Sequence, residues 1–400
     1  MFFMNLLSKA APSSRVVTID STLGNVLMAG SSPKGMNMIM TNYAIDCLNK
    51  GGGVIIFRDV NNGFEANPSI TTAISNICQI NNEEFALTRQ FDPFSCFSDS
   101  QVNSYIIDIF DSYSEVDKNK RMSYQNYIAL IRNLLQKKGK KVRLNELAEY
   151  DFETVEQMNN TLPMPDAERI RNERFLNSFL PDAREIESYF SHFASNTIGE
   201  ILSGNQSLEK ILQTKPIIEV SLDFDTQEKE SELLMTVLVD NICKLKLSNA
   251  NRTSLAVIAN EVPNEMLIKS KFHKIIKSTR DCKAVYSVAD LSNLVKQSND
   301  WIEYADSYFF FKQNSNDNKD FCSKFFGTYE KTKETRTKGV TRPTFGDMIS
   351  GKGTSSRQSS TSYTTEKEAV YLPDVFANLP ENEAIYFFKS NNEHMRLTVY

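Results

Sequence analysis

The stretch Asn25-Val26-Leu27-Met28-Ala29-Gly30-Ser31-Ser32-Pro33-Lys34-Gly35-Met36-Asn37 decides how this chain folds. Its apolar run Val26–Ala29 predicts a buried strand, and the glycine-bounded stretch Gly30–Gly35 predicts the loop that follows. Apolar residues then recur at spacings of three and four, which predicts a helix; they are Met36, Ile39, Met40, Tyr43, Ala44 and Cys47. A strand, a loop and a helix in this order begin a β-α-β unit.

The sequence on either side completes the pattern. Three glycines at 51–53 end the helix, and Val54–Phe57 predicts a second buried strand, parallel to the first. Further strands are predicted at 15–19, 217–222, 254–259, 284–288, 307–311, 384–388 and 395–400. The sequence therefore predicts an α/β fold with a mainly parallel central sheet.

Between residues 98 and 212 the apolar spacing is helical throughout, and prolines at 163, 165 and 181 mark expected breaks. We therefore expect residues 1–97 to form the first part of a sheet domain and 98–212 an inserted all-α domain. Residues 213–400 complete the sheet domain. Within them, about 331–368 is rich in Lys, Arg, Thr, Ser and Gly, which predicts a mobile polar loop.

The composition excludes several classes of protein. The net charge of −5 gives no general attraction to nucleic acid, and no stretch reaches about 18 consecutive apolar residues, so we expect a cytoplasmic chain without direct membrane insertion. The six cysteines and three histidines are scattered, with no C-x-x-C pair, so we expect neither a disulfide framework nor a metal site. The cysteines are at 47, 78, 96, 243, 282 and 322, and the histidines at 192, 273 and 394.

The loop after the first strand has the place of a phosphate-binding loop, G-x-x-x-x-G-K-[ST], in which backbone amides, a lysine and a hydroxyl hold the phosphates and Mg²⁺. Gly30 and Gly35 keep the glycine spacing, but Met36 replaces the lysine and Asn37 the hydroxyl residue. Many ordinary strand-to-helix turns would also match two such glycines. Lys34 remains as an alternative source of positive charge. The candidate nucleotide residues are Gly30, Ser31, Ser32, Pro33, Lys34, Gly35, Met36 and Asn37.

A second candidate site follows the apolar run 255–259. In nucleotide hydrolases such a strand ends in Asp-Glu, where the aspartate anchors Mg²⁺ and the glutamate orients the attacking water. Here Asn260 replaces the aspartate and Glu261 is retained. Taken alone, the pattern is more often that of an ordinary buried strand ending in polar residues.

Several stretches together resemble the TraG/TraD coupling ATPases of conjugation and type IV secretion, relatives of the FtsK/HerA proteins. They span most of the chain, in the family's order: 28–32, 51–57, Phe91-Asp92-Pro93-Phe94, Asn260-Glu261-Val262-Pro263-Asn264, Arg280, 284–294, 309–313, 325–327, 372–373 and 379–380. In the family a glutamine typically closes the strand at 284–288, and Ala289 stands there in this chain. We expect no counterpart here of the N-terminal transmembrane segments of the family's membrane-bound members.

The resemblance implies a RecA-like P-loop NTPase fold interrupted by an all-α domain, usually assembled as a ring with itself or a homologous ATPase. Its expected partners are secretion or conjugation components and DNA, with attachment to the inner membrane through those partners. With Met36, Asn260 and Ala289 altered, we expect a pseudo-ATPase that needs no cofactor. Two alternatives stay open: an active DNA-translocating ATPase using Lys34 and Glu261, and a sensor that binds ATP with Mg²⁺ weakly without turnover.

Two basic stretches are candidates for DNA contact. One opens the polar segment at 331–342, and the other follows a predicted helix; its cations are Lys137, Lys138, Lys140, Lys141 and Arg143. Clustered cations can contact phosphates, but lysines also favour helix C-termini and solvated loops. Aromatic residues do not alternate with these cations, so base stacking is not indicated.

Overall fold

The computed structural model describes residues 19–60, 70–78, 90–278, 281–341 and 356–399. They form two compact units, one of Met1–Phe311 with Glu381–Tyr400 and one of Lys312–Pro380. Of the strand predicted at 15–19, only residue 19 is among the described residues. Of the strand predicted at 395–400, only residue 400 is outside them.

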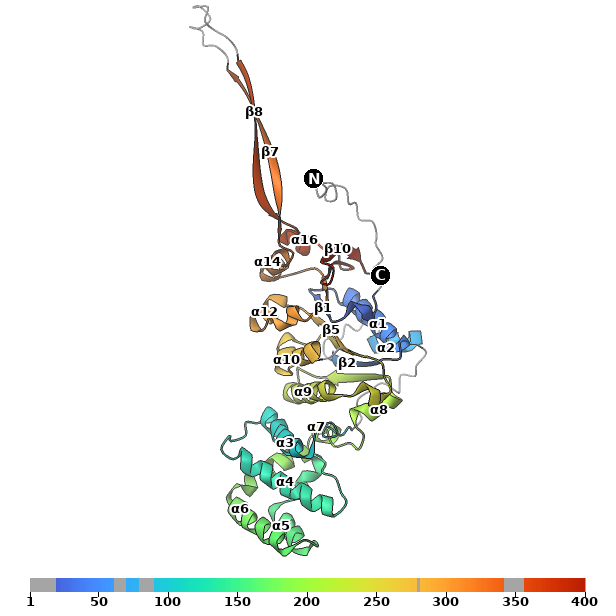
Figure 1. Cartoon of the computed structure of the whole chain (residues 1–400), viewed down its shortest axis with the longest axis vertical. Helices are drawn as coiled ribbons and strands as arrows, with labels where there is room; N and C mark the ends of the chain where they lie inside the picture. The colour runs from blue at the N-terminus through green and yellow to red at the C-terminus, as the bar shows by residue number, and fades with distance from the viewer. Residues whose placement is uncertain (1–18, 61–69, 79–89, 279–280, 342–355, 400) are drawn as a thin grey trace, which may run out of the picture. The chain divides into compact units, whose positions relative to one another are not determined.

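The first unit is built on an eight-stranded sheet of order β10-β9-β6-β1-β5-β4-β2-β3 (Figure 1). The run from β6 to β3 is parallel, and β9 and β10 add an antiparallel edge. The strands are β1 (Val26–Ala29), β2 (Gly53–Asp59), β3 (Ile217–Leu222), β4 (Leu255–Asn260), β5 (Cys282–Val288), β6 (Ser307–Phe310), β9 (Glu383–Phe388) and β10 (Glu393–Thr398). This confirms the predicted mainly parallel sheet.

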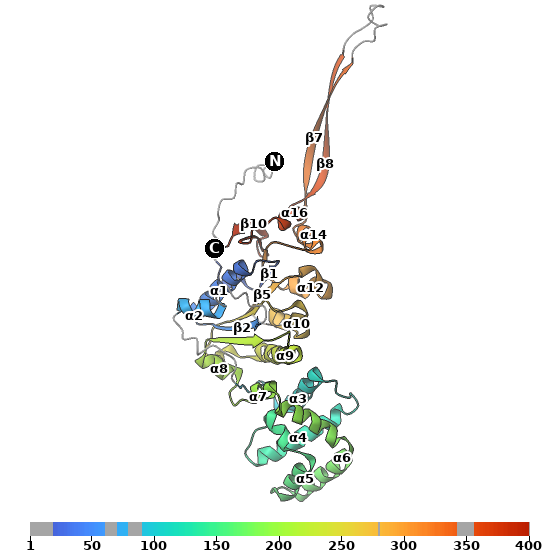
Figure 2. The ribbon, with the colours of Figure 1, turned by 180° about the vertical axis from the view of Figure 1, so that it is seen from behind.

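Helices cover both faces of the sheet. Figures 1 and 2 show α1 and α2 on one face and α9, α10 and α12 on the other. Burial on both faces explains why β1 is apolar along its whole length, β4 is apolar up to its last residue, Asn260, and both strands are buried at every position. These helices, with the short ones between them, are η1 (Ser21–Leu23), α1 (Pro33–Asn49), α2 (Ile70–Cys78), α9 (Glu228–Lys244), η4 (Leu247–Ala250), α10 (Asn264–Lys269), α11 (His273–Ser278), α12 (Leu291–Gln297) and α13 (Asp300–Glu303).

Between Asp99 and Thr214 all described elements are helical: α3 (Asp99–Tyr113), α4 (Arg121–Lys137), η3 (Asn145–Glu149), α5 (Phe152–Thr161), α6 (Asp166–Ala194), α7 (Thr197–Ile201) and α8 (Leu208–Thr214). The break predicted at Pro181 is wrong, because that residue lies inside α6. Buried Phe179 and Ala183 on either side of it keep this part of the helix packed. The segment belongs to the same compact unit as the sheet, so a separate insertion domain with ends at 98 and 212 stays a prediction.

The stretch of chain that enters the helical segment is hydrogen-bonded to the stretch that leaves it. Phe91 N–H donates to Ile201 O at 2.8 Å, and Gly204 N–H donates back to Phe91 O at 3.0 Å. A Cβ at position 204 would lie 2.2 Å from the carbonyl carbon of Gln90, so only glycine allows this approach. The entering and leaving stretches of chain are therefore held together where the helical segment joins the sheet.

The second unit contains α14 (Asn316–Phe325), α16 (Pro373–Ala377) and a long antiparallel hairpin of β7 (Thr328–Thr341) and β8 (Ser356–Ala369). The prediction of a mobile loop at 331–368 is therefore wrong for the described residues of this segment, which form the two paired strands of the hairpin. Residues 342–355 lie outside the described residues. Composition pointed to a loop because the segment has few apolar residues. β-branched threonines, however, favour extended strands even where both faces are polar.

Two features are absent from the described residues. None of their helices is long and apolar enough to cross a bilayer. They also contain no group of three or more His, Cys, Asp or Glu side chains placed to hold a metal ion.

Candidate nucleotide site

The candidate residues gather at one edge of the sheet. Because β1, β5, β4 and β2 are parallel neighbours, their carboxyl ends and the residues that follow them meet at the same edge. The loop at 30–35 follows β1, Ala289 follows β5 and Glu261 follows β4. This edge is where a parallel α/β sheet places its ligands.

The loop after β1 is shorter than its sequence indicated. Gly30 has φ +117°, and its N–H donates to Val288 O at 3.0 Å, which ties the loop to the end of β5. Helix α1 already begins at Pro33, so Lys34 and Gly35 lie in its first turn. In a phosphate-binding loop the residues between the two glycines wrap the phosphates before the helix begins. Here only Gly30, Ser31 and Ser32 lie between strand and helix.

Two contacts cover this short loop. The ring of Phe311, itself fully buried, lies so close to Gly35 that a Cβ there would be 2.7 Å from Phe311 Cε1. The buried Ser32 hydroxyl donates a hydrogen bond to the backbone carbonyl of Glu381, just before β9. The chain's own C-terminal part thus occupies the side of the loop that holds Gly35 and Ser32.

The two altered loop positions have different environments. Met36 is buried in the hydrophobic core with Ile39 and Met40, so a lysine there would have to bury its ammonium group. The Oδ1 atom of Asn37 is buried without a hydrogen-bond partner within the described residues. Lys34 is exposed and is the one cation of the sequence between Gly30 and Asn37. The first turn of α1 therefore offers few groups that could hold a phosphate.

The end of β4 holds a second orphaned amide. Asn260 is 5% exposed, and its Oδ1 has no hydrogen-bond partner in the described part of the chain. The next residue, Glu261, has φ +56°, a left-handed conformation that is uncommon for a residue with a side chain, and its N–H donates to Ser287 Oγ at 3.2 Å. Ala289 is exposed after β5. Backbone of this kind is enriched at functional sites and also occurs in ordinary turns.

The structure adds residues that the sequence analysis did not predict. Arg58 and the buried Asp59 end β2, beside β4, where Arg58 lies opposite Asn260 in the register. Arg58 forms an ion pair with Glu219 of β3 at 3.4 Å. The signal was available, because Arg58-Asp59 directly follows the apolar run 54–57 just as Asn260-Glu261 follows 255–259.

These charges act on Glu261. Burial raises the pKa of its carboxyl; Arg58 opposes the rise and Asp59 adds to it. The folded state therefore holds this proton more tightly than the unfolded chain does. The contribution to stability is fully present at low pH and is lost as the pH rises above the ordinary pKa of 4.5.

We expect Glu261→Gln to raise the melting temperature at pH 7 by about 1–3 °C, because it removes a half-buried charge. Well below pH 4.5 the two proteins should melt together, since the wild-type carboxyl is then neutral as well. Thermal unfolding followed by circular dichroism over a pH series tests this. An equal difference at every pH would show that the carboxyl's charge is not the cause.

The basic run after α4 is partly neutralised. Lys137 pairs with Glu168 at 3.2 Å and Arg143 pairs with Glu146 at 2.9 Å. Lys138, Lys140 and Lys141 are exposed and make no ion pair in the part of the chain that the structure describes. DNA contact by the five cations stays a prediction, and three of them carry the unpaired charge.

Comparison with solved structures places the fold among known proteins, although no family model and no curated protein sequence matches the chain. The bacterial conjugative coupling protein TrwB, in its unbound form, aligns over 94% of this chain and 84% of its own, with 13% identity and a TM-score of 0.51. TrwB in complex with the non-hydrolysable ATP analogue ADPNP aligns over 94% and 85%, with 12% identity and a TM-score of 0.53. VirB4 of Thermoanaerobacter pseudethanolicus aligns over 94% and 89%, with 7% identity and a TM-score of 0.51.

At these identities the likeness establishes the fold. The RecA-like P-loop NTPase fold predicted from the sequence is confirmed, and the resemblance to coupling ATPases holds at the level of the fold. The roles of the candidate site residues remain predictions.

Proposed function

We propose, from a TrwB-like fold with a shortened and covered nucleotide loop, that this chain is a coupling-protein-like pseudo-ATPase. It would act as a structural or DNA- and substrate-recruiting component of a conjugation or type IV secretion apparatus. The observation that carries the proposal is the start of α1 at Pro33 under the Phe311 ring.

The residues present do not fit ATP held with Mg²⁺. Phosphates are held by wrapped backbone amides, a lysine and a hydroxyl. Pro33 has no N–H, Met36 N–H already donates to Ser32 O at 2.9 Å, and the Ser32 hydroxyl is bonded to Glu381. TrwB, by contrast, has been solved in complex with ADP and Mg²⁺.

The assembly role follows from what the fold keeps. A RecA-like domain that no longer hydrolyses ATP can still present the surface through which such domains assemble, with itself or with an active homologous ATPase. Secretion or conjugation components would bring it to the inner membrane from the cytoplasm, and DNA would be held by local basic patches such as the exposed Lys138 and Lys140.

A second candidate function has one specific observation in its favour. Glu261 keeps the position of the water-orienting residue, is half-buried and has a left-handed backbone. An active DNA-translocating ATPase would use Glu261 with Lys34 as its phosphate-binding cation. This alternative ranks second because Lys34 lies two residues before the replaced lysine position, about 200° around a helix that has already begun.

The recruiting role predicts that the purified full chain either assembles with itself or binds DNA. Light scattering coupled to size exclusion should show a species several times the 45.5 kDa monomer, or an electrophoretic shift should show DNA retention that weakens with salt. A monomer that binds neither single- nor double-stranded DNA nor a coexpressed secretion ATPase would contradict the proposal.

A further inference from the structure

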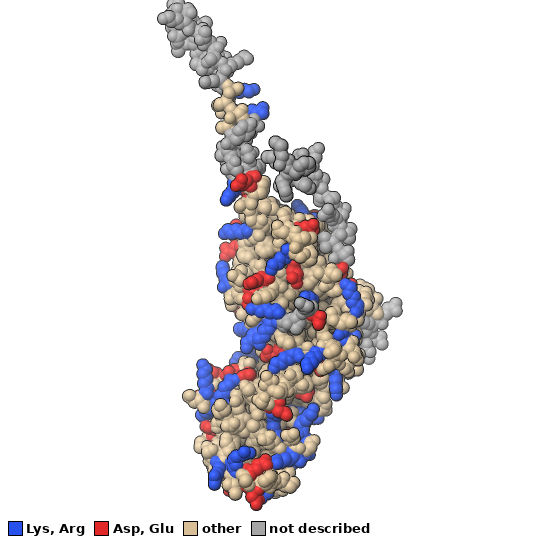
Figure 3. Space-filling view, viewed as in Figure 1, with Lys and Arg blue, Asp and Glu red and all other residues tan. Residues whose placement is uncertain are grey.

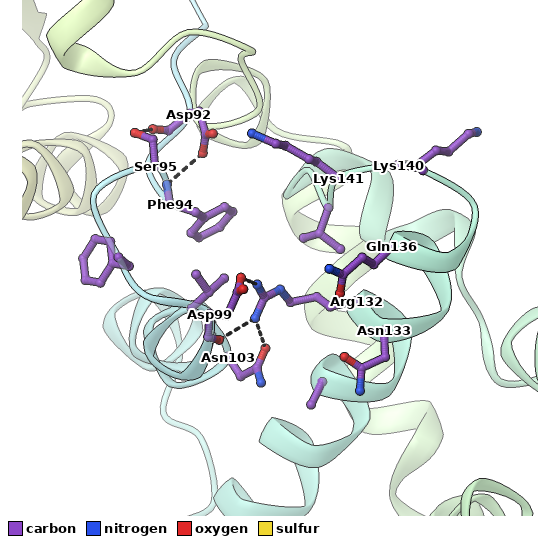
Figure 4. Close-up of a pocket in the computed structure, with 15 residues that line it drawn as sticks. Asp92, Phe94, Ser95, Asp99, Asn103, Arg132, Asn133, Gln136, Lys140 and Lys141 are labelled. Carbon is purple, nitrogen blue, oxygen red and sulfur yellow. Dashed lines mark hydrogen bonds and ion pairs between the residues drawn. The ribbon is translucent and has the colours of Figure 1, made fainter. Parts of the chain in front are cut away.

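A cavity of about 700 Å³ lies in the helical segment, away from the nucleotide loop. Its walls come from the chain at 92–97, from α3, from α4 and from the loop at 139–142 (Figure 4). This volume is in the range of sites that hold a small ligand or a short stretch of peptide.

One wall carries hydrogen-bonding side chains in fixed places. Arg132 of α4 donates to Asp99 O and Asn103 Oδ1 of α3 at 2.7 and 2.8 Å, and pairs with Asp99 Oδ1 at 2.7 Å. Because Arg132 holds the Oδ1 atom of Asn103, the amide N–H groups of Asn103 keep a fixed direction. One turn along α4, the Gln136 side chain also lines the cavity and makes no hydrogen bond among the described residues.

A cation faces the opposite side of the cavity. In Figure 4, Lys141 extends across the opening toward Asp92, whereas Lys140 points away from it. Asp92 already accepts a hydrogen bond from Phe94 N–H at 2.9 Å through Oδ1. Lys141 is exposed and has no ion-pair partner in the described part of the chain, so its charge is available to a ligand.

The aromatic residues of the cavity argue against nucleic acid as the occupant. Proteins that bind single-stranded nucleic acid offer exposed aromatic rings on which the bases stack. Phe97 is stacked on Tyr105 with ring centroids 3.9 Å apart, and Lys244 Nζ lies 3.2 Å from the Phe97 ring centroid. Phe94 is only 8% exposed. These rings form an apolar wall and leave no stacking platform.

We propose that this cavity binds an extended acidic peptide segment of a partner protein. Gln136 and Asn103 supply amides of the kind that pair with a peptide backbone, Phe94 offers an apolar wall, and Lys141 pairs with a carboxylate of the ligand. The inference gives the recruiting role proposed above a substrate class. It rests on that role for its biological meaning but not on the state of the nucleotide loop.

Fluorescence anisotropy with the purified full chain tests the proposal. The probes are labelled ten-residue peptides of alternating glycine with glutamate, glutamine or lysine. We expect the glutamate peptide to bind about three- to fivefold more tightly than the glutamine peptide, because only a glutamate side chain can form an ion pair with the exposed Lys141. The lysine peptide should not bind.

Variants then locate the binding. Lys141→Glu should weaken binding of the glutamate peptide by about tenfold or more, and Gln136→Ala by about fivefold. Lys138→Glu is the matched control, since Lys138 is an exposed, unpaired cation of the same run that does not line the cavity, and it should change binding by less than about threefold. All of these side chains are exposed, so the variants should fold, which their melting temperatures will show.

Three outcomes would overturn the inference: no preference for the glutamate peptide, equal losses for Lys141→Glu and Lys138→Glu, or competition by a twenty-nucleotide oligo-dT with the same dependence on Lys141. The last would assign the cavity to nucleic acid. None of these results bears on ATP turnover, so the pseudo-ATPase proposal would stand or fall separately.

Discussion

Purified full chain given ATP and Mg²⁺ should release phosphate no faster than buffer alone, with or without DNA. Removing one well-placed charge-stabilising group from an active site typically costs about a hundred- to a thousandfold in rate. In the proposed pseudo-ATPase, Met36, Asn260 and Ala289 would each stand in place of such a group, and the Phe311 ring lies against Gly35 as well. We therefore expect a loss of at least about a thousandfold relative to an active ATPase of this fold.

A coupled phosphate-release assay with single- and double-stranded DNA measures this, and titration with a fluorescent ATP analogue measures binding. Glu261→Gln and Lys34→Ala should leave both readouts unchanged. DNA-stimulated release that disappears in either variant would establish the active alternative. Saturable binding without release would establish the sensor.

The substitution Gly204→Ala should loosen the base of the helical segment. Its new methyl group would lie 2.2 to 2.4 Å from backbone atoms of Gln90 and Phe91, which cannot turn aside as a side chain could. Overpacking of this kind costs about 1–3 kcal/mol and sometimes more. Since Phe91 is bonded to both Ile201 and Gly204, both hydrogen bonds should weaken with it.

Limited trypsin digestion followed by mass spectrometry is the measurement. We expect cleavage within 90–215 to become at least about fivefold faster in the variant, with the sites at Arg58 in β2 and Lys283 in β5 still protected. Gly53→Ala is the matched control, because its Cβ would make only ordinary contacts of 3.4 Å or more with Leu212 and Leu255. Equal digestion of the two variants, or uniform destabilisation of the sheet, would show that Gly204 does not have this role.

The sheet could be predicted from the sequence because its strands are buried on both faces. The apolar runs Val26–Ala29, 255–259 and 284–286 each lie in an observed strand, β1, β4 and β5. The hairpin β7–β8 could not be predicted in this way. Its stability comes from main-chain pairing of polar, threonine-rich strands, which leaves no apolar pattern in the sequence.

The site was predicted in part. Polar residues that follow apolar runs correctly indicated the sheet edge at Asn260 and Glu261, and the same rule applied to Arg58 and Asp59 would have added β2. The contact of Phe311 with Gly35 joins residues 276 positions apart and has no local signal. The early start of α1 has a local signal in Pro33, which suits the first helical position.

The order of the strands determines how late β1 can find its partners while the chain is made on the ribosome. Strand β1 lies between β5 and β6, and its first residue, Val26, pairs with Ser307. At about 5–20 residues per second, roughly 15 to 60 s pass between the making of these two residues. For most of that interval the apolar strand β1 has no partner strand on either edge. The helices at 99–214 can already pack on one another. The nascent chain should therefore depend on chaperones that shield β1 until the last third of the protein has emerged.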